Sequence, residues 1–193
     1  MIKQIKFPTQ TFMAGAYIDL ELCDKIIEYH KTFRHRAYNG TIGDKNKSYV
    51  DTKTKQSLDL HLNKNEYLFS EYNKELEKIL SLYEKKYKFV KNLQTFNNTQ
   101  ESTNIQYYKP SEGFKAWHAE RHGLFTSRRQ LVFMTYLNDV PKGGTDFYYY
   151  PELNIQAKKG LTIIWPADWT HTHRGVVSKT HEKYIVTGWF NFF

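Results

Sequence analysis

Two patterns of hydrophobic positions divide the chain. In residues 20–34 and 65–87, apolar side chains recur every three or four positions, which predicts two amphipathic helices. Asp19 precedes the first of these segments and is a suitable N-cap. Further along, the apolar positions alternate instead, which is typical of strands with one buried face. We therefore expect one domain, in which a helical part (residues 1–102) supports a β-rich part (residues 103–193).

Turn signals rich in proline and glycine, such as Pro141 to Gly144, separate the alternating segments. A short strand is also expected at residues 57–62, after a polar loop at 35–56. The eight main strands are expected at about residues 103–109, 114–119, 130–137, 145–150, 153–158, 161–165, 172–177 and 183–192. Many short strands after two helices predict a mainly β fold, a jelly roll with the helices packed against one outer sheet.

Composition and charge narrow the class of protein. The 15 tyrosines and 13 phenylalanines suit strands. The net charge of +8 favours an anionic partner or a lysine-rich surface, but no lysine and arginine cluster or RNA-binding motif points to nucleic acid. Cys23 is the only cysteine, which excludes an internal disulfide and a cysteine-rich zinc site. With neither a signal peptide nor a membrane span in the sequence, we expect a soluble protein of the cytoplasm.

His118 and Glu120 stand two positions apart at the end of the segment IQYYKPSEGFKAWHAE. In an extended strand, alternate side chains point to the same face, so this imidazole and this carboxylate would lie side by side. They would supply two of the three ligands of a 2-His-1-carboxylate site, which binds a ferrous ion and leaves other positions open for substrates. Such a site needs a second histidine from elsewhere in the chain.

Two histidines near the C-terminus can complete the set. His171 and His173 are two positions apart, and either one would serve as the third ligand. Lys183 begins the last predicted strand, where its ammonium group would bind a carboxylate of a co-substrate that also contacts the metal. Tyr108 and Tyr136 would add hydroxyl donors to the same anion.

Other side chains near this region are open to two interpretations. Arg121, Arg128 and Arg129 would either contact an acidic substrate at the mouth of the barrel or face water. A set of aromatic residues would either line a groove for an extended, proline-rich peptide or pack within the sheets. These are Trp117, Tyr148, Tyr149, Tyr150 and Trp169.

The spacing of these residues resembles that of the 2-oxoglutarate and Fe(II)-dependent oxygenases, and within them the prolyl 4-hydroxylase type. The pattern is Tyr108, His118-Ala119-Glu120, Tyr136, His173, Lys183 and Trp189. The segments YKPSEGFKAWHAE, LVFMTYLNDVPKGGTDF and GLTIIWPADWTHTHRG are similar to small bacteriophage and bacterial members of the group. The likeness is strong over roughly residues 103–192 and loose over the helical part.

The resemblance implies a double-stranded β-helix with a role for each matched residue. His118, Glu120 and His173 would be the iron ligands. Lys183 and Tyr136 would hold the far carboxylate of 2-oxoglutarate. Tyr108 would line the co-substrate pocket, and Trp189 would be the aromatic residue beside the metal.

This sequence departs from the pattern of the family in two ways. The family usually has aspartate where Glu120 stands, and the longer side chain would shift the metal geometry. The second departure is the additional histidine, His171; the ten-residue interval to Lys183 favours His173 as the ligand.

The resemblance also implies cofactors and a substrate class. Fe(II), 2-oxoglutarate and O2 are expected, and ascorbate is an optional addition. The expected substrate is a prolyl residue of a peptide or protein. Two alternatives are an oxygenase acting on a free amino acid, lipid or nucleobase, and a non-catalytic jelly roll that binds a metal or sugar. The oligomeric state is left open.

Overall fold

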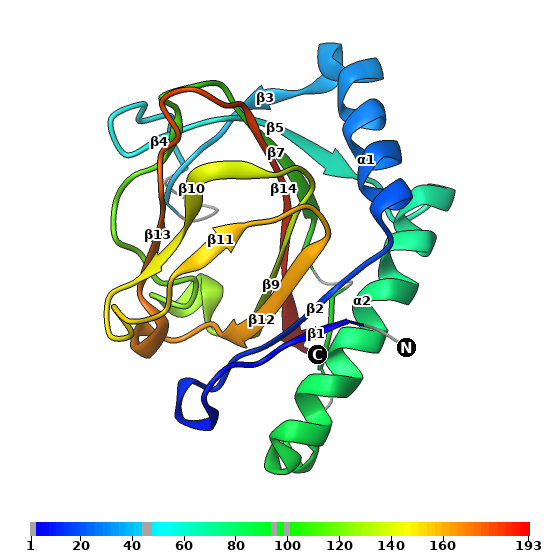
Figure 1. Ribbon diagram of the computed structural model, residues 1–193, viewed down its shortest axis with the longest axis vertical. Coiled ribbons are helices and arrows are strands. Elements are labelled where there is room, and N and C mark those ends of the chain that lie inside the picture. Colours follow the sequence, from blue (N-terminus) through cyan, green and yellow to red (C-terminus); the bar gives the residue numbers. More distant parts are fainter. Residues whose placement is uncertain (1–2, 44–47, 94–95, 99–100) are drawn as a thin grey trace.

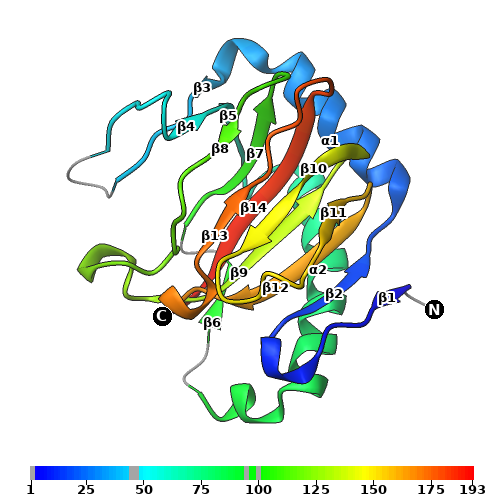
Figure 2. The same cartoon turned by 60° about the vertical axis from the view of Figure 1, so that its left-hand side comes forward.

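The computed structural model describes residues 3–43, 48–93, 96–98 and 101–193. Within these residues, two α-helices cover one face of a large antiparallel sheet, and two small sheets lie against its other face (Figures 1 and 2). The helices are α1 (Leu20–Thr32) and α2 (Tyr67–Lys86). This mainly β, double-sheet architecture confirms the predicted fold class. No described helix combines the length and apolar character needed to cross a membrane.

The large sheet runs through the centre of the molecule. In order, its strands are β1 (Gln4–Ile5), β2 (Ala14–Tyr17), β12 (Leu161–Pro166), β9 (Arg129–Tyr136), β14 (Lys183–Phe192), β7 (Thr103–Tyr108), β5 (Leu58–Leu62) and β3 (Tyr38–Asn39). β6 (Phe96–Asn97) also pairs with β14. Five of these strands, β1, β2, β3, β5 and β6, come before residue 103, so the sheet extends across the expected division of the chain into two parts.

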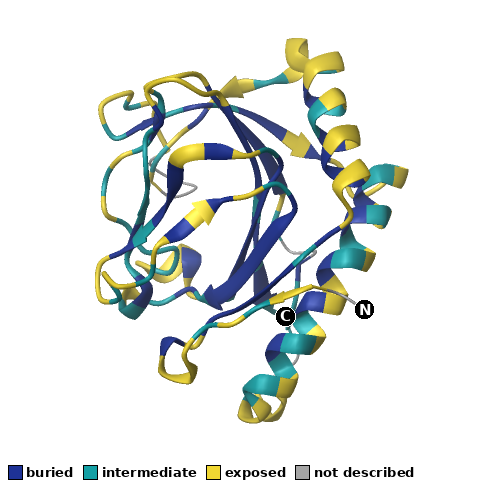
Figure 3. Ribbon diagram, viewed as in Figure 1, coloured by how far each residue is buried: buried dark blue, intermediate teal, exposed yellow. Residues whose placement is uncertain are grey.

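The small sheets close the other side of the barrel. One contains β11 (Ile155–Ala157), β10 (Val140–Phe147) and β13 (His173–Gly175), and the other contains β4 (Lys55–Gln56) and β8 (Gly113–Phe114). The strands that face each other across the barrel are largely buried (Figure 3). Their inward side chains form a core that is separate from the core under the helices.

The helices form as their sequence pattern predicts. The side chain of Asp19 accepts a hydrogen bond of 2.8 Å from the backbone N–H of Glu21, which confirms the predicted N-cap. The apolar faces of both helices pack on the outer face of the large sheet. Tyr72 of α2 also shares a hydrogen bond of 2.8 Å with the Thr135 hydroxyl of β9, which gives this buried polar group a partner.

The register of the large sheet places a row of side chains on its inner face. Across the four strands β5, β7, β14 and β9, the aligned residues are Asp59, Gln106, Ile185 and Tyr136. Residues directly opposite one another in an antiparallel pair share a face, so all four point toward the interior of the barrel. Two residues away along β7 and β14, Lys183 lies opposite Tyr108 on the same face.

Three local predictions are wrong at least in part. The expected loop at 35–56, of which residues 44–47 lie outside the described residues, contains the short strands β3 and β4. Residues 114–119 do not form a strand, because only Gly113 and Phe114 pair with β4, and His118 makes an isolated bridge. The segment Pro141 to Gly144 is not a turn between strands but part of β10, which continues through a shift in register. Lys142 adopts a left-handed backbone conformation there (φ 55°), and a Cβ on Gly144 would lie 1.7 Å from the Ile155 carbonyl oxygen. Glycine therefore permits the close approach to β11.

Candidate active site

A cavity of about 490 Å³ lies inside the barrel, between the large sheet and the small sheets. All seven residues predicted for the site line it, although they come from several strands and from the segment after β8. These are Tyr108, His118, Glu120, Tyr136, His173, Lys183 and Trp189. The fold therefore brings the whole predicted set to the wall of one cavity.

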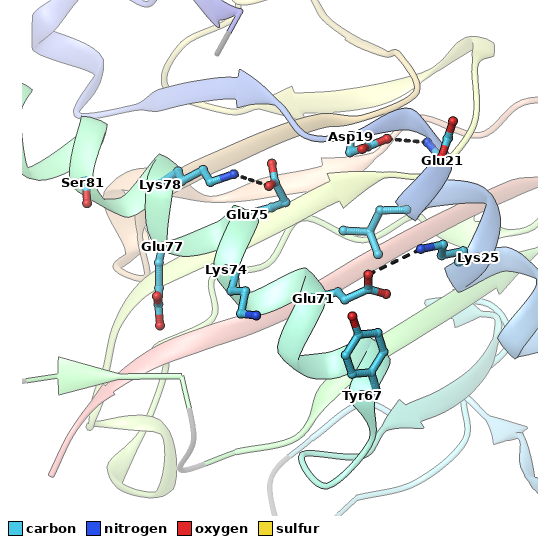
Figure 4. A pocket seen from close by; sticks show the side chains of 11 residues that line it. Asp19, Glu21, Lys25, Tyr67, Glu71, Lys74, Glu75, Glu77, Lys78 and Ser81 are labelled. Carbon is cyan, nitrogen blue, oxygen red and sulfur yellow. Dashed lines mark hydrogen bonds and ion pairs between the residues drawn. The ribbon is translucent and has the colours of Figure 1, made fainter. Parts of the chain in front are cut away.

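A second hollow, of about 600 Å³, lies between α1 and α2 on the outside of the molecule (Figure 4). Its lining includes lysine and glutamate side chains, and some of them neutralise one another, as in the pairs Lys25–Glu71 and Lys78–Glu75. It contains no histidine and none of the predicted residues. We therefore place the candidate active site in the barrel.

The ligand atoms of His118, Glu120 and His173 lie within 4.8 Å of one another. The Glu120 Oε1 atom is 3.6 Å from Nε2 of His118 and 3.7 Å from Nε2 of His173. This is the only group of this kind among the described residues. Two imidazole nitrogens and one carboxylate are the donor set of non-haem Fe(II) sites, so the residues present fit such a metal.

Direct backbone pairing brings the two histidines together. The N–H of His118 donates to the carbonyl of His173 (3.0 Å), and the N–H of His173 donates to the carbonyl of His118 (2.9 Å). His118 is thus positioned by this bridge and not by the predicted strand. The ring of Phe114 also stacks on that of His118, with centroids 3.6 Å apart.

The Nδ1 atom of each histidine, which does not face Glu120, fixes the orientation of the ring. Nδ1 of His118 lies 2.9 Å from the carbonyl oxygen of Ala116, and Nδ1 of His173 lies 2.9 Å from that of His171. A carbonyl only accepts, so each Nδ1 carries a proton, and in the neutral form of each ring Nε2 has a free lone pair. Burial first, and then the charge of His118, lower the pKa of His173 to about 3. Its neutral form, which is the form that binds metal, therefore prevails at neutral pH.

The Glu120 carboxylate is held from its opposite side. The Trp189 indole N–H donates to Oε2 (3.0 Å), and Arg129 donates to the same oxygen (3.4 Å) and to the backbone carbonyl of Glu120 (3.0 Å). Burial raises the pKa of Glu120, but the positive charges that His118 and His173 carry when protonated, together with the Arg129 guanidinium, outweigh burial and lower the pKa well below its ordinary value. Glu120 is therefore ionised, with Oε1 facing the histidines.

His171, the alternative third ligand, is directed elsewhere. Its Nε2 lies 2.9 Å from the carbonyl oxygen of Thr11, and its Nδ1 lies 3.0 Å from the hydroxyl of Thr170. It does not line the cavity. The geometry thus groups His173, and not His171, with His118 and Glu120.

Lys183 is a buried cation in the same cavity. Its Nζ donates to the carbonyl oxygens of Gly143 and Val176, both at 3.0 Å, and no carboxylate pairs with it among the described residues. Burial lowers the pKa of Lys183 to about 8. The Tyr136 hydroxyl shares a hydrogen bond of 2.6 Å with Thr145, and burial raises the pKa of Tyr136, so the phenol keeps its proton. This arrangement suits an anionic group that would pair with the lysine.

The hydroxyl of Tyr108 does not point toward that anion position. It donates to Oε1 of Gln106 (2.7 Å), while the ring of Tyr108 faces Lys183 with Nζ 5.2 Å from its centroid. Tyr108 therefore lines the cavity with its ring, and its predicted role as a hydroxyl donor is not seen in this structure.

Sequence reasoning missed part of the site. Arg129 lines the cavity, but its guanidinium stacks on Trp189 at 3.6 Å and pairs with Glu101 and Glu120. Phe114, which stacks on His118, was also missed. Both contacts join residues that are distant in the chain or placed by an irregular segment, so no local spacing could have indicated them.

Comparison with known proteins defines the class. A family model described as the 2OG-Fe(II) oxygenase superfamily matches residues 103–191, the segment that supplies all seven predicted residues. The match of residues 103–191 to the model of the 2OG-Fe(II) oxygenase superfamily supports a dioxygenase activity. No protein with a curated description matches the sequence.

Solved structures with the same fold are prolyl hydroxylases. A viral collagen prolyl hydroxylase from Paramecium Bursaria Chlorella virus-1, in a 2OG complex, has a TM-score of 0.69 and 18% identity, over 94% of this chain and 97% of that one. A prolyl-4-hydroxylase from Pseudomonas putida has a TM-score of 0.69 and 11% identity, over 96% and 98%. A prolyl hydroxylase from Trichoplax adhaerens, in complex with a hypoxia inducible factor peptide fragment, has a TM-score of 0.72 and 12% identity, over 94% and 84%. At these identities the likeness shows the fold.

The contacts of Arg129 generate a prediction. In the metal-free protein, Arg129→Met should raise the pKa of Glu120, because a neighbouring guanidinium that favours the carboxylate is lost. The folded-state pKa of Glu120 lies below its unfolded value, so its contribution to stability is present above the unfolded pKa and is lost as pH falls through the folded pKa. The variant should begin this loss at a higher pH.

A carbon-13 NMR titration of the glutamate carboxyl groups measures this change. Arg174→Met is the matched control, because Arg174 pairs with the exposed Asp146 and does not contact Glu120. Identical titration of Glu120 in the Arg129→Met variant and in the unaltered protein would contradict the role that we assign to Arg129.

Proposed function

We propose that the chain is an Fe(II)- and 2-oxoglutarate-dependent dioxygenase that hydroxylates a prolyl residue in a peptide or protein. The observation that carries this proposal is that a 2-His-1-carboxylate group and an unpaired buried lysine share one cavity. A metal-binding module has no need for the lysine. A dicarboxylate that contacts the metal at one end requires a cation at the other.

His118, Glu120 and His173 would hold the iron, since all three present their free ligand atoms to one point. Fe(II) bound there supplies the redox chemistry that couples the conversion of 2-oxoglutarate and O2 to succinate and CO2 with insertion of one oxygen atom into a substrate C–H bond. The protein residues keep the ligand set ready. Arg129 and Trp189 keep Glu120 ionised and oriented, and the carbonyl of Ala116 orients His118.

Lys183 would bind the far carboxylate of 2-oxoglutarate, and the Tyr136 hydroxyl would donate to the same carboxylate after turning from Thr145. The ring of Tyr108 and the side chain of Ile185 would line the co-substrate between the two ends. These contacts orient the co-substrate and exclude water from it.

A ladder of aromatic rings supports a peptide as the substrate. Trp117, Tyr148, Tyr149 and Trp169 are exposed and contact one another in sequence, edge to face, with centroids 5.3, 5.1 and 5.8 Å apart. Trp117 also lines the cavity, so the ladder begins at the rim of the candidate active site. Aromatic surfaces of this kind suit extended proline-rich segments. Tyr150, which was expected to join them, instead packs against His171.

The class of activity has a direct test. Purified protein, freed of metal, should form succinate from 2-oxoglutarate only when Fe(II) is added, and His118→Ala and Glu120→Ala should abolish this turnover and weaken metal binding. Calorimetry with Zn²⁺ measures binding independently of turnover. His171→Ala is the matched control and should retain metal binding. A His118→Ala variant with unaltered metal affinity would show that the metal site is wrongly placed.

The peptide substrate is tested with the aromatic ladder. A proline-rich peptide should gain the mass of one oxygen atom on incubation, and Tyr149→Ala with Trp169→Ala should raise the KM for the peptide about tenfold, because two contact rings are lost. Phe89→Ala, which removes an exposed ring outside the ladder, should leave the KM unchanged. If proline peptides are not modified but a free amino acid, a lipid or a nucleobase is, the alternative oxygenase function replaces the prolyl one.

The pH dependence of co-substrate binding follows from Lys183. Its ammonium form is present below the pKa of about 8 and is lost as pH rises through that value. Affinity for 2-oxoglutarate should therefore be greatest below about pH 8 and fall by up to about tenfold per pH unit above it. Calorimetry on the metal-loaded protein measures this fall. Lys183→Arg should remove the pH dependence, because a guanidinium stays charged; a decline that persists in Lys183→Arg would assign the titration to another group.

A further inference from the structure

A buried ion pair lines the cavity and takes no part in the proposed chemistry. Lys55 of β4 is 5% exposed and Asp59 of β5 is 3% exposed. The Lys55 Nζ atom lies 2.7 Å from Oδ2 of Asp59, and both side chains line the cavity that contains the metal-binding group. Burying two charges is costly even when they pair, so the position of this pair within a binding cavity calls for an explanation.

Neighbouring residues hold the pair in place. Asp59 stands opposite Gln106 in the sheet, and the Gln106 amide N–H donates to the same oxygen, Oδ2, at 3.3 Å. The other end of the Gln106 amide accepts from Tyr108. Behind Lys55, the backbone of Gly40 passes so closely that a Cβ there would lie 2.8 Å from Lys55 Cε and 2.1 Å from Ser57 Oγ. The pair is thus held in place at the wall of the cavity.

The second carboxylate oxygen of Asp59 has no partner. Oδ1 is buried and makes no hydrogen bond within the described part of the chain, whereas Oδ2 has two donors. A buried acceptor without a partner costs free energy, and a ligand that supplies a donor recovers it. Trp165, which also lines the cavity, has a buried Nε1 atom without a partner among the described residues. An indole N–H can only donate a hydrogen bond, so Trp165 would not bind the donor groups that Asp59 can accept.

The charge of the pair selects the kind of donor. Asp59 and Lys55 neutralise each other at 2.7 Å, so the wall carries no net charge. An anionic ligand would face a carboxylate oxygen that can only accept, and an ammonium group would enter a buried space beside the Lys55 cation. A neutral N–H or O–H satisfies Oδ1 without adding a charge to the interior.

We propose that Oδ1 of Asp59 is a substrate subsite that accepts a hydrogen bond from a neutral donor, such as a peptide N–H or a carboxamide. The proposal rests on the proposed function, which it deepens by specifying the sequence around the target. An unbroken run of prolines has no backbone N–H, so the preferred substrate would carry a residue other than proline beside the modified one.

Two pairs of small probes test the subsite, and the members of each pair differ only in the donor. The first pair is acetyl-prolinamide and its N,N-dimethylamide; the second is N-methylacetamide and N,N-dimethylacetamide. Each is titrated into the full nitrogen-15-labelled chain with Zn²⁺ and 2-oxoglutarate, and the backbone amide signals of Asp59 and Gln106 are followed. The donor-bearing member should bind about tenfold more tightly, as expected for one hydrogen bond to a charged acceptor.

Substitutions test whether the Lys55–Asp59 pair causes the preference for the donor-bearing probe. Replacing both members, with Lys55→Met and Asp59→Leu, removes the acceptor without leaving a buried unpaired charge, and should reduce the preference to within about twofold. The matched control replaces the exposed pair on α2, with Lys78→Met and Glu75→Leu, and should keep the full preference. Thermal unfolding verifies that each variant is folded.

A second measurement needs no variant. In the unaltered chain, the N-methyl group of bound N-methylacetamide should show a nuclear Overhauser effect to the side-chain amide of Gln106, which adjoins Asp59. Absence of this effect, equal affinity within both probe pairs, or tighter binding of methylammonium than of N-methylacetamide would overturn the proposal. If only the N-methylacetamide pair shows the preference, the subsite stands and the prolyl function fails; succinate formation reports on the oxygenase activity separately.

Discussion

The backbone bridge between His118 and His173 is the constraint on which the site depends. Two reciprocal hydrogen bonds set these residues directly opposite each other, and each ring is then turned by its own Nδ1 contact to a nearby carbonyl. The bridge joins the segment after β8 to β13, which is itself paired with β10. A site of this kind is therefore only as precise as the pairing of these short segments.

The large sheet contributes the remaining parts of the site through its register. β14 presents Lys183 at one end and Trp189 further along, and both point to the inner face because their positions differ by an even number of residues. The outer face of the same strands is covered by α1 and α2. The helices thus stabilise the strand that carries the site without contacting the cavity, which explains why a mainly β active site is built on a helical support.

Cavity groups that can form more bonds than their protein partners supply indicate where ligands would bind. The charged groups of the cavity are held by protein partners on one side, as Arg129 and Trp189 hold Glu120, and are open on the other. The three ligand atoms of the metal-binding group, the ammonium of Lys183 and Oδ1 of Asp59 keep unused bonding capacity within the described part of the chain. They suit a metal, a carboxylate and a neutral donor, respectively, so one cavity is complementary to three different chemical groups.

The class of fold and most elements could be predicted because they follow from local periodicity. The helical spans, the N-cap at Asp19 and the strands at 130–137, 161–165 and 183–192 were all readable in the sequence. The seven predicted site residues, which all line the cavity, were indicated by the resemblance to a known family. Local rules failed where tertiary contacts decide the backbone. In residues 114–119, the strand ends at Phe114 because no further described residue pairs with β4. Pro141 to Gly144 continue a strand because β10 pairs with β11 through a shift in register.

The sequence by itself determined which chemical groups are available and which face of each element they occupy, because side-chain type and periodicity are local properties. The tertiary structure alone decided which groups meet. It grouped His173, and not His171, with the other two ligand residues, and it turned the Tyr108 hydroxyl toward Gln106. It also placed Arg129 against Glu120 and left one carboxylate oxygen of Asp59 without a hydrogen-bond partner among the described residues. These outcomes depend on strand pairing between residues far apart in the chain, and no local pattern in the sequence encodes the distance between two such side chains.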